Sequence, residues 1–489
     1  MKRIANLLLL LALSFSWTAF GAELKIGCGT VDFTPPRPVP LDGQMGTRIS
    51  KMAITPITAN ILAMEGTNPK GMKSSCIIVS CDMVGIRPEF ENAIRAELKK
   101  LLPDFDPHNM MLSATHTHTA PVADDHKYHI DPKSDCMRPN EFVAFAGKKI
   151  ADGIAEAWNN RKPAKFSYGL GQAFVAQCRR SVYASGEARM YGKTNEPNFR
   201  NIEAFEDRDV NTMFFQDASG KLLATVVNVS CPAQEVESLK NLHADYWHFV
   251  RENLHKIWGP DVVIVALCGA AGDMSPHTQY RRVAEDRMSK LRNLTRVEEI
   301  GRRVAVSVAD VYDTVKDEQF TDVPFEHNYS VLDLPQYRIT KEEYEQSKAE
   351  ALSLKEVVKK EPNRRRLLSW AQTIVDRYEK QQNDPNASFK IPVHVLRVGD
   401  TAVCSNPFEL FTSFGTQIKS RSAAKQTFVV QLTDGCGICG TASSAGYLPT
   451  REAYAGGGYS AIVKSITVGP DGGQKLVEET LDLIDPMFK

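Results

Sequence analysis

The sequence lacks a charge imbalance, a second long apolar run and any repeated or low-complexity segment. Its 489 residues contain 59 Lys and Arg against 59 Asp and Glu, so the formal net charge is zero. A balanced charge gives no sign of a nucleic-acid partner, which would call for a broad basic surface. Because no linker or repeat divides the chain, we expect one large domain. A hydrophobic content of 43% with 8% aromatics is that of an ordinary globular core.

Only the first residues of the chain resemble a segment that enters a membrane. A basic start, an apolar run and small residues at 19–22 predict a secretory signal peptide over 1–22. An uncleaved anchor is the alternative, and the shortness of the apolar run disfavours it. No cysteine that could carry a lipid anchor follows the run. We therefore predict that residues 23–489 are exported and either periplasmic or secreted.

Ten cysteines are scattered along the chain, and their spacing does not fix which of them pair. The stretch "CGIC" at 436–439 suggests redox or metal chemistry. It lacks the βαβ surroundings of a thioredoxin-like motif, so we predict a loop with one local disulfide.

Strand-like apolar runs alternate with amphipathic helical stretches along the whole chain. The run at 74–86 is followed by a helical pattern at 88–102, and 140–160 repeats apolar residues at three- and four-residue spacings. The segment 341–382 is dense in Lys, Glu and Arg, which predicts a charged helical hairpin broken near Pro362. The expected fold class is α/β, a single large domain of mixed β-sheets flanked by helices.

The stretch "NMMLSATHTHTAP" at 109–121 places two of only 11 histidines, His116 and His118, two positions apart. The apolar residues before them predict a short buried strand. Alternate side chains of a strand share one face, so both imidazoles could reach one site, ~7 Å apart along the backbone. Such a pair often binds a metal ion. A pair of hydrogen-bonded histidines at a strand end is the alternative.

A second loop, "CGAAGDMSP" at 268–276, follows another strand-like run. Gly269 and Gly272 allow a close backbone approach, and Asp273 and Ser275 come next. Ser275 could be a nucleophile, an oxyanion donor or a turn former. The loop lacks the G-x-S-x-G arrangement of the α/β-hydrolase elbow, which disfavours that family.

Six short motifs, in order, resemble those of the neutral/alkaline non-lysosomal ceramidases. They run from about residue 24 to 460 and read "DFTPP", "LSATHTHTAP", "CRRSVYA", "AAGDMSP", "NPFELFT" and "AGYLPTREAYAGGGY". The last has tyrosines at the family's intervals, Tyr447, Tyr454 and Tyr459. The resemblance implies the fold of that family's catalytic domain, here without the C-terminal immunoglobulin-like domain and with the charged helical insertion at 341–382.

The resemblance also implies a single zinc ion, Zn²⁺, with His116, Glu409 and Tyr447 among its ligands. The family's remaining histidine ligand is missing, because the matching segment reads "VVNVSCPAQEVE". Alignment on the proline puts Cys231 in its place, and a thiolate is a good zinc ligand. Other candidates for this ligand are Gln234, His243 and His248.

The expected catalytic residues come from the same motifs. The resemblance makes Ser275 the active serine, and it makes His118 and Arg180 the groups that contact the substrate and its oxyanion. Zinc-bound water or Ser275 could be the nucleophile. Asp273 could orient a catalytic partner or cap the backbone of its turn.

These motifs predict an exported zinc-dependent hydrolase of a linear amide bond. Ceramide is the family's substrate, and an acylated lipid, an acyl-amino acid or an N-acylated sugar all remain open. A lipid substrate would also bring the protein to a membrane surface. The alternatives are a zinc-dependent enzyme acting on glycans and a non-catalytic binding protein that lost the metal.

Overall fold

The computed structural model describes residues 23–384, 386–435 and 445–489. The predicted signal peptide and the "CGIC" stretch lie outside the described residues. The eight cysteines within them are free thiols. No helix in the described ranges is both long and apolar enough to span a bilayer.

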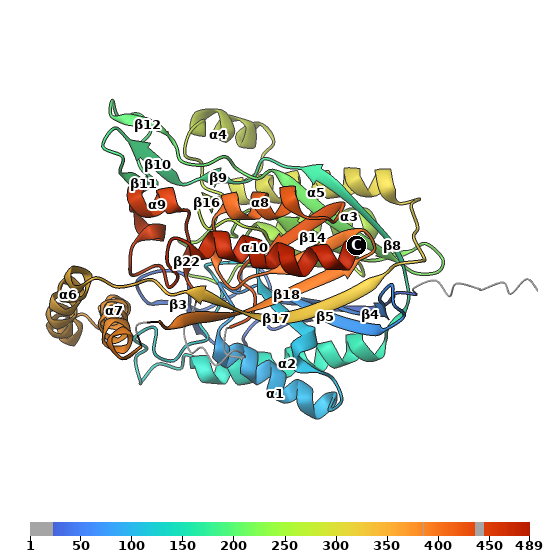
Figure 1. Ribbon diagram of the computed structural model, residues 1–489, viewed down its shortest axis with the longest axis horizontal. Coiled ribbons are helices and arrows are strands. Elements are labelled where there is room, and N and C mark those ends of the chain that lie inside the picture. Colours follow the sequence, from blue (N-terminus) through green and yellow to red (C-terminus); the bar gives the residue numbers. More distant parts are fainter. Residues whose placement is uncertain (1–22, 385, 436–444) are drawn as a thin grey trace, which may run out of the picture.

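Three mixed sheets form the body of the molecule (Figure 1). The first has the order β6-β5-β4-β1-β7, the second β15-β14-β13-β8 and the third β17-β18-β19-β21. The strands of the first sheet are β1 Lys25–Asp32, β4 Thr58–Thr67, β5 Lys73–Cys81, β6 Met110–Ala114 and β7 Lys162–Pro163. Those of the second sheet are β8 Lys165–Gln172, β13 Asp209–Gln216, β14 Leu222–Val229 and β15 Val263–Cys268. Those of the third sheet are β17 Phe325–Pro335, β18 Ser388–Val398, β19 Thr401–Ser405 and β21 Gln426–Val430.

The period-2 alternation of the strands divides their side chains between two cores. On β4, Ile61 and Ala63 pack toward helices, whereas Leu62 and Met64 point to the opposite face. That opposite face belongs to a central core shared by all three sheets, with Val226 and Phe428 as members from the second and third. The three sheets therefore enclose one common interior.

Helices cover the outer face of each sheet, and their apolar sides complete three further cores. Figure 1 shows α1 and α2 beneath the first sheet and α8 and α10 above the third. The six covering helices are α1 Pro88–Leu101 and α2 Pro139–Asn159 on the first sheet, α3 Tyr246–Trp258 and α5 Arg296–Val315 on the second, and α8 Thr412–Arg421 and α10 Gly472–Ile484 on the third.

The predicted α/β class with mixed sheets and flanking helices is confirmed. The charged hairpin is also present, as α6 Lys341–Lys360 and α7 Arg365–Asn383 with a break at Pro362. A capping box of Thr340 and Glu343 begins α6. The remaining elements are β2 Val39–Leu41, β3 Arg48–Ser50, β9 Gln177–Cys178, β10 Arg180–Tyr183, β11 Ala188–Met190, β12 Phe199–Ile202, β16 Met274–Ser275, β20 Glu409–Leu410, β22 Tyr447–Leu448, α4 Arg282–Leu291 and α9 Arg451–Gly456.

Each sheet contains one parallel pair, β5 with β6, β14 with β15, and β19 with β21. Loops that follow such strands are where α/β proteins gather functional groups. The loop after β15 reaches the segment after β19, since Gly272 N–H donates to the Leu410 carbonyl at 2.8 Å. A Cβ at Gly272 would lie 2.2 Å from the carbonyl oxygen of Glu409, so the close approach requires glycine.

A buried ion pair joins the first sheet to the helix layer of the second. Arg251 of α3 holds both oxygens of Asp82, which directly follows β5, at 2.7 and 3.0 Å. The same carboxylate accepts hydrogen bonds from Thr58 and from the Thr115 hydroxyl, just before the first histidine. Asp82 is thereby fully satisfied although its side chain is 0% exposed.

Candidate active site

The two histidines of the T-H-T-H motif do not share a strand face. Strand β6 ends at Ala114, and His116 adopts a left-handed backbone with φ of 68°. That conformation is rare for a residue other than glycine and occurs where the surroundings enforce it. The expectation of two alternate strand positions is therefore corrected. The turn still brings the imidazoles together, with ring centroids 4.8 Å apart.

Acceptor atoms converge in front of His116. Its Nδ1 donates to the Val84 carbonyl at 2.5 Å, which leaves Nε2 with a free lone pair. That Nε2 lies 3.2 Å from His118 Nε2 and 3.4 Å from Glu409 Oε2. Burial alone would raise the pKa of Glu409, but His116 and Arg179 together lower it to about 2. The carboxylate is therefore charged at neutral pH.

Tyr447 extends this cluster from the next strand. Glu409 and Tyr447 are register partners in the parallel pair of β20 and β22. Burial, together with the negative charge of the nearby Glu409 carboxylate, raises the pKa of Tyr447. The ring of Tyr459 packs edge-on against Tyr447 at 5.7 Å.

The structure brings Arg179, and not Arg180, to this cluster. Arg179 Nη2 donates to the Tyr447 hydroxyl and to the Gly272 carbonyl, both at 3.0 Å. Its Nε is buried with no hydrogen-bond partner among the described residues. The guanidinium of Arg180 instead pairs with Glu203 and donates to the Gly457 carbonyl at 2.8 Å. The "RR" pair in the sequence indicated an arginine here, and the strand geometry decides which one faces the site.

Ser275 is fully buried on β16 and has a partner that the sequence did not reveal. Its hydroxyl lies 3.1 Å from the Tyr191 hydroxyl and accepts from the His277 backbone N–H at 3.1 Å. Tyr191 also has a left-handed backbone, with φ of 54°, and packs edge-on against His277. Tyr191 lies outside every motif that we identified. Its unusual feature is the positive φ, which cannot be read from the sequence.

Asp273 caps backbone at the start of a helix far away in sequence, and not in its own turn, as one of its two alternatives had it. Its carboxylate accepts from the backbone N–H and the hydroxyl of Thr412, at 2.9 and 2.8 Å. Thr412 is the first residue of α8, so a buried acceptor satisfies the start of that helix. Asp273 thus fixes the loop that carries Ser275.

The structure does not bring Cys231 to the cluster. Its thiol faces the carbonyls of Val175 and Pro232, and burial raises its pKa well above the ordinary value. From the same segment Gln234 reaches the site, with Nε2 2.7 Å from His118 Nε2. His243 accepts from the backbone of Asp245 and packs against His248, and neither ring makes a contact with His116 or Glu409 among the described interactions.

Glu237 links the histidines on the outer side of the cluster. One carboxylate oxygen lies 3.1 Å from His118 Nδ1 and the other 3.2 Å from His277 Nε2. These contacts outweigh burial and lower the pKa of Glu237. Arg48 fixes this arrangement from behind, because its guanidinium donates to the carbonyls of His118 and Glu237.

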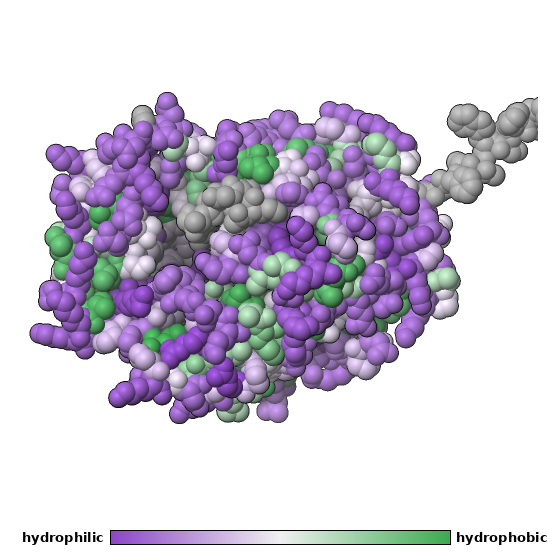
Figure 2. Space-filling model, turned by 90° about the horizontal axis from the view of Figure 1, so that it is seen from below, coloured by the Kyte–Doolittle hydropathy of each residue, from purple (hydrophilic) through white to green (hydrophobic). Residues whose placement is uncertain are grey.

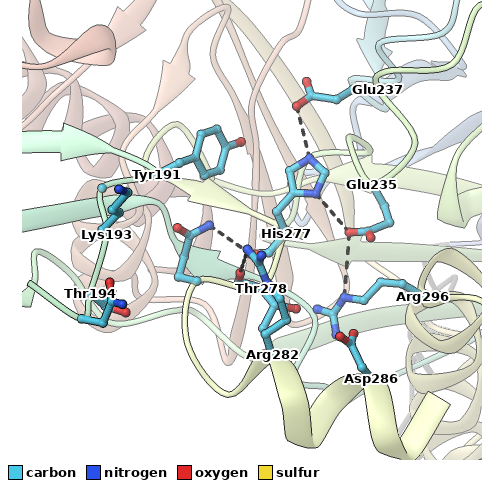
Figure 3. Close-up of a pocket in the computed structure, with 13 residues that line it drawn as sticks. Tyr191, Lys193, Thr194, Glu235, Glu237, His277, Thr278, Arg282, Asp286 and Arg296 are labelled. Atoms are coloured by element: carbon cyan, nitrogen blue, oxygen red, sulfur yellow. Dashed lines mark hydrogen bonds and ion pairs between the residues drawn. The ribbon is translucent and has the colours of Figure 1, made fainter. Parts of the chain in front are cut away.

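A cavity of about 690 Å³ opens beside these groups (Figure 3). Tyr191, Glu237 and His277 belong to both the cluster and the cavity wall. Figure 3 shows His277 between Glu237 and Glu235, with the Arg296 guanidinium beyond Glu235. A substrate in the cavity would therefore contact Tyr191 and His277, the two residues that are hydrogen-bonded to the buried Ser275 hydroxyl.

Within the part of the chain that the structure describes, no group of three or more His, Cys, Asp or Glu side chains has the geometry of a metal centre. The cluster nevertheless has one histidine whose free nitrogen faces a second histidine and a carboxylate. A phenol stands behind the carboxylate, so the donor types are those of a zinc site.

Comparisons with known proteins give one kind of match. No protein-family model matches the chain, and no curated protein matches its sequence. The structure is similar to that of the neutral ceramidase from Pseudomonas aeruginosa, with a TM-score of 0.66 and 15% identity over 96% of this chain and 75% of that one. A ceramidase complexed with C2 gives 0.64 and 15%, over 95% and 75%. The chain therefore has a ceramidase-like fold.

Proposed function

We propose that this protein is a zinc-dependent hydrolase of linear N-acyl amides and a divergent member of the ceramidase family. The observation that carries the proposal is the convergence of His116 Nε2, His118 Nε2 and Glu409 Oε2. With Nδ1 of His116 acting as donor, its Nε2 presents a lone pair to a carboxylate. With Gln234 donating to His118 Nε2, the His116 lone pair and the Glu409 carboxylate face each other, and a cation between them would relieve their repulsion.

The measured separations fit a zinc ion. Zinc bonds to nitrogen and oxygen are about 2.0–2.1 Å long, so two ligands of a tetrahedral ion lie about 3.3 Å apart. Among the residues assigned to the metal, His116 Nε2 is 3.4 Å from Glu409 Oε2, which matches that separation. His116, Glu409 and Tyr447 are the residues that we assign to the metal, with the His118 and Gln234 side chains at its edge. Val84 fixes the tautomer of His116, as a partner of the other ring nitrogen does in zinc proteins.

A bound zinc would supply Lewis acidity and a water of lowered pKa. The residues of the chain would supply the rest of the chemistry. Arg179 offers a buried donor for the oxyanion that develops on the amide carbonyl. Tyr191 holds the Ser275 hydroxyl and can exchange a proton with it, whether Ser275 attacks or orients the substrate. Hydrolysis would release a carboxylate and an amine.

Metal content tests the ligand assignment without any substrate. We expect about one zinc per chain in the wild type and in Cys231→Ala, and loss of zinc in His116→Ala and Glu409→Gln, because only the latter two remove converging donors. Elemental analysis of purified protein after dialysis against zinc measures this. Cys404→Ala, a buried thiol on β19, is the matched control for Cys231.

Two results would contradict the assignment. Loss of zinc in Cys231→Ala but not in Cys404→Ala would indicate that the Cys231 thiol is a zinc ligand. A wild type that takes up no zinc would favour the non-catalytic binding protein, since the hydrolytic mechanism needs the ion.

A second prediction concerns Tyr191. We expect Tyr191→Phe to lower kcat by about 10²-fold with zinc content unchanged, because the variant removes the only described side chain that reaches the Ser275 hydroxyl. Hydrolysis of an N-acyl amide under saturating substrate measures it. Tyr344→Phe, in the α6–α7 hairpin, is the control for loss of a phenol elsewhere. Wild-type turnover in Tyr191→Phe would remove Tyr191 from the reaction.

We also propose that the protein is exported, which the character of residues 1–22 supports. A glycan-active hydrolase is the second candidate function. The observation that favours it is the polar cavity beside the site, which differs from the apolar pocket that a lipid amide would need.

A further inference from the structure

The cavity beside Ser275 has an unusual wall for an enzyme with a ceramidase-like fold. None of its thirteen lining residues, all within the described ranges, is aliphatic, and Tyr191 is its one phenol. Ligand pockets of this volume usually have mostly hydrophobic walls. Five of the lining residues carry a formal charge, Lys193, Glu237, Arg282, Asp286 and Arg296, and burial raises the pKa of a sixth ionisable residue, Glu235, to about 7. An alkyl chain placed here would displace water from these charged groups, a cost that a mostly hydrophobic wall does not impose.

Some of the charged groups of the cavity wall form ion pairs with described residues, and others do not. Glu237 is held by His118 and His277, and Arg296 pairs with Glu285 at 3.0 Å. By contrast, neither Lys193 nor Arg282 forms an ion pair with any described residue, and the Arg282 guanidinium donates only to the Thr278 carbonyl at 3.3 Å. In the view of Figure 3, Lys193 and Arg282 lie on the side of His277 opposite to Glu235. This side of the cavity therefore has cationic donors available to a ligand.

Glu235, on the other side, has unused acceptor capacity. Its Oε2 is buried and accepts no hydrogen bond from the residues described. His277 Nδ1 is 3.5 Å and Arg296 Nε 3.9 Å from that oxygen, both too long for good hydrogen bonds. Glu235 lines the cavity, so a ligand hydroxyl can donate to its carboxyl group, and the Gln279 amide, which donates to the His277 carbonyl at 3.2 Å, adds a nearby polar partner.

We infer that the group next to the scissile amide is hydrophilic, bearing hydroxyls and an acidic substituent, as in an N-acylated amino sugar with a phosphate or carboxylate. Lys193 and Arg282 bind the acidic substituent, and Glu235 accepts from a hydroxyl. The inference rests on the proposed amide hydrolysis for the position of the bond, and it names the substrate class of that same site. It replaces the lipid chain that the family resemblance implied.

Binding of three amines to the full mature chain, supplied with zinc, tests the inference independently of turnover. The probes are glucosamine 6-phosphate, glucosamine and octylamine, measured by calorimetry with the wild type, Lys193→Gln/Arg282→Gln and the control Lys290→Gln. Lys290 lies on the same helix, α4, but outside this cavity. We expect glucosamine 6-phosphate to bind most tightly, and its affinity to fall about 10- to 100-fold in the double variant only.

The N-hexanoyl derivatives of the same amines, assayed for hydrolysis, separate the two proposals. Tight binding of the sugar phosphate without hydrolysis of any amide would uphold the inference and overturn the proposed function. Preferred binding of octylamine, or equal sugar phosphate affinity in the wild type and the double variant, would overturn the inference. Hydrolysis of the octylamine amide alone would overturn it too, while leaving the amide hydrolase standing.

Discussion

Arg179→Gln is expected to lower kcat about 10²- to 10³-fold, the usual cost of removing one oxyanion donor. Its guanidinium is anchored to Tyr447 and Gly272 and keeps one buried N–H without a partner in the described chain. Such a donor is preorganised for a charge that develops only during the reaction. Because Gln leaves the proposed metal ligands in place, the zinc content should not change.

Arg180→Gln is the matched control, one residue away and equally buried. It leaves Glu203 without its partner, so we expect a loss of stability and a much smaller loss of turnover in the folded fraction. Steady-state kinetics on an N-acyl amide, with thermal unfolding of both variants, distinguishes the two. If Arg180→Gln were the inactive variant and Arg179→Gln the active one, the assignment of the oxyanion donor would be reversed.

Arg251→Met is expected to destabilise the fold by about 3–5 kcal/mol, because the buried Asp82 carboxyl group would be left without its cation. The urea dependence of unfolding, recorded on metal-free protein, measures the change without a contribution from bound zinc. Asp82 also holds Thr115, so the loss should be accompanied by weaker zinc binding at His116.

Arg37→Met provides the comparison for an exposed ion pair. Arg37 and Glu141 are about half exposed, and such pairs contribute at most about 1 kcal/mol. If Arg251→Met had the same unfolding midpoint as Arg37→Met, the buried pair of Arg251 and Asp82 would contribute no more to stability than an exposed ion pair.

Much of the fold could be predicted from periodicity. The helices at α1 and α2 follow their apolar spacing, and the hairpin breaks at Pro362 as expected. The proximity of His116 to His118 was also expected, but the sequence predicted two positions on one strand face, whereas the structure shows a turn. A left-handed residue ends the strand early, and the conformation of a single histidine cannot be read from its neighbours in sequence.

The parts of the site that could not be predicted depend on the direction of a side chain. The sequence does not distinguish Arg179 from Arg180. Their side chains point in opposite directions because β10 begins at Arg180. Cys231 and Gln234 belong to one short segment. In the structure the Cys231 thiol faces the Val175 carbonyl and points away from the histidines. The charged wall of the cavity combines residues from four separate segments, so no local pattern announces it.

The gathering of the candidate metal ligands from separate sheets has a consequence for biogenesis. His116 follows β6, whereas Glu409 and Tyr447 belong to the last fifth of the chain. Contacts so distant in sequence cannot form until nearly all of the chain has been synthesised, and closing so long a loop costs entropy. If the protein binds zinc as proposed, the ion would be captured in the compartment where folding finishes, and the zinc supply in that compartment would limit how much metal-loaded protein a cell obtains.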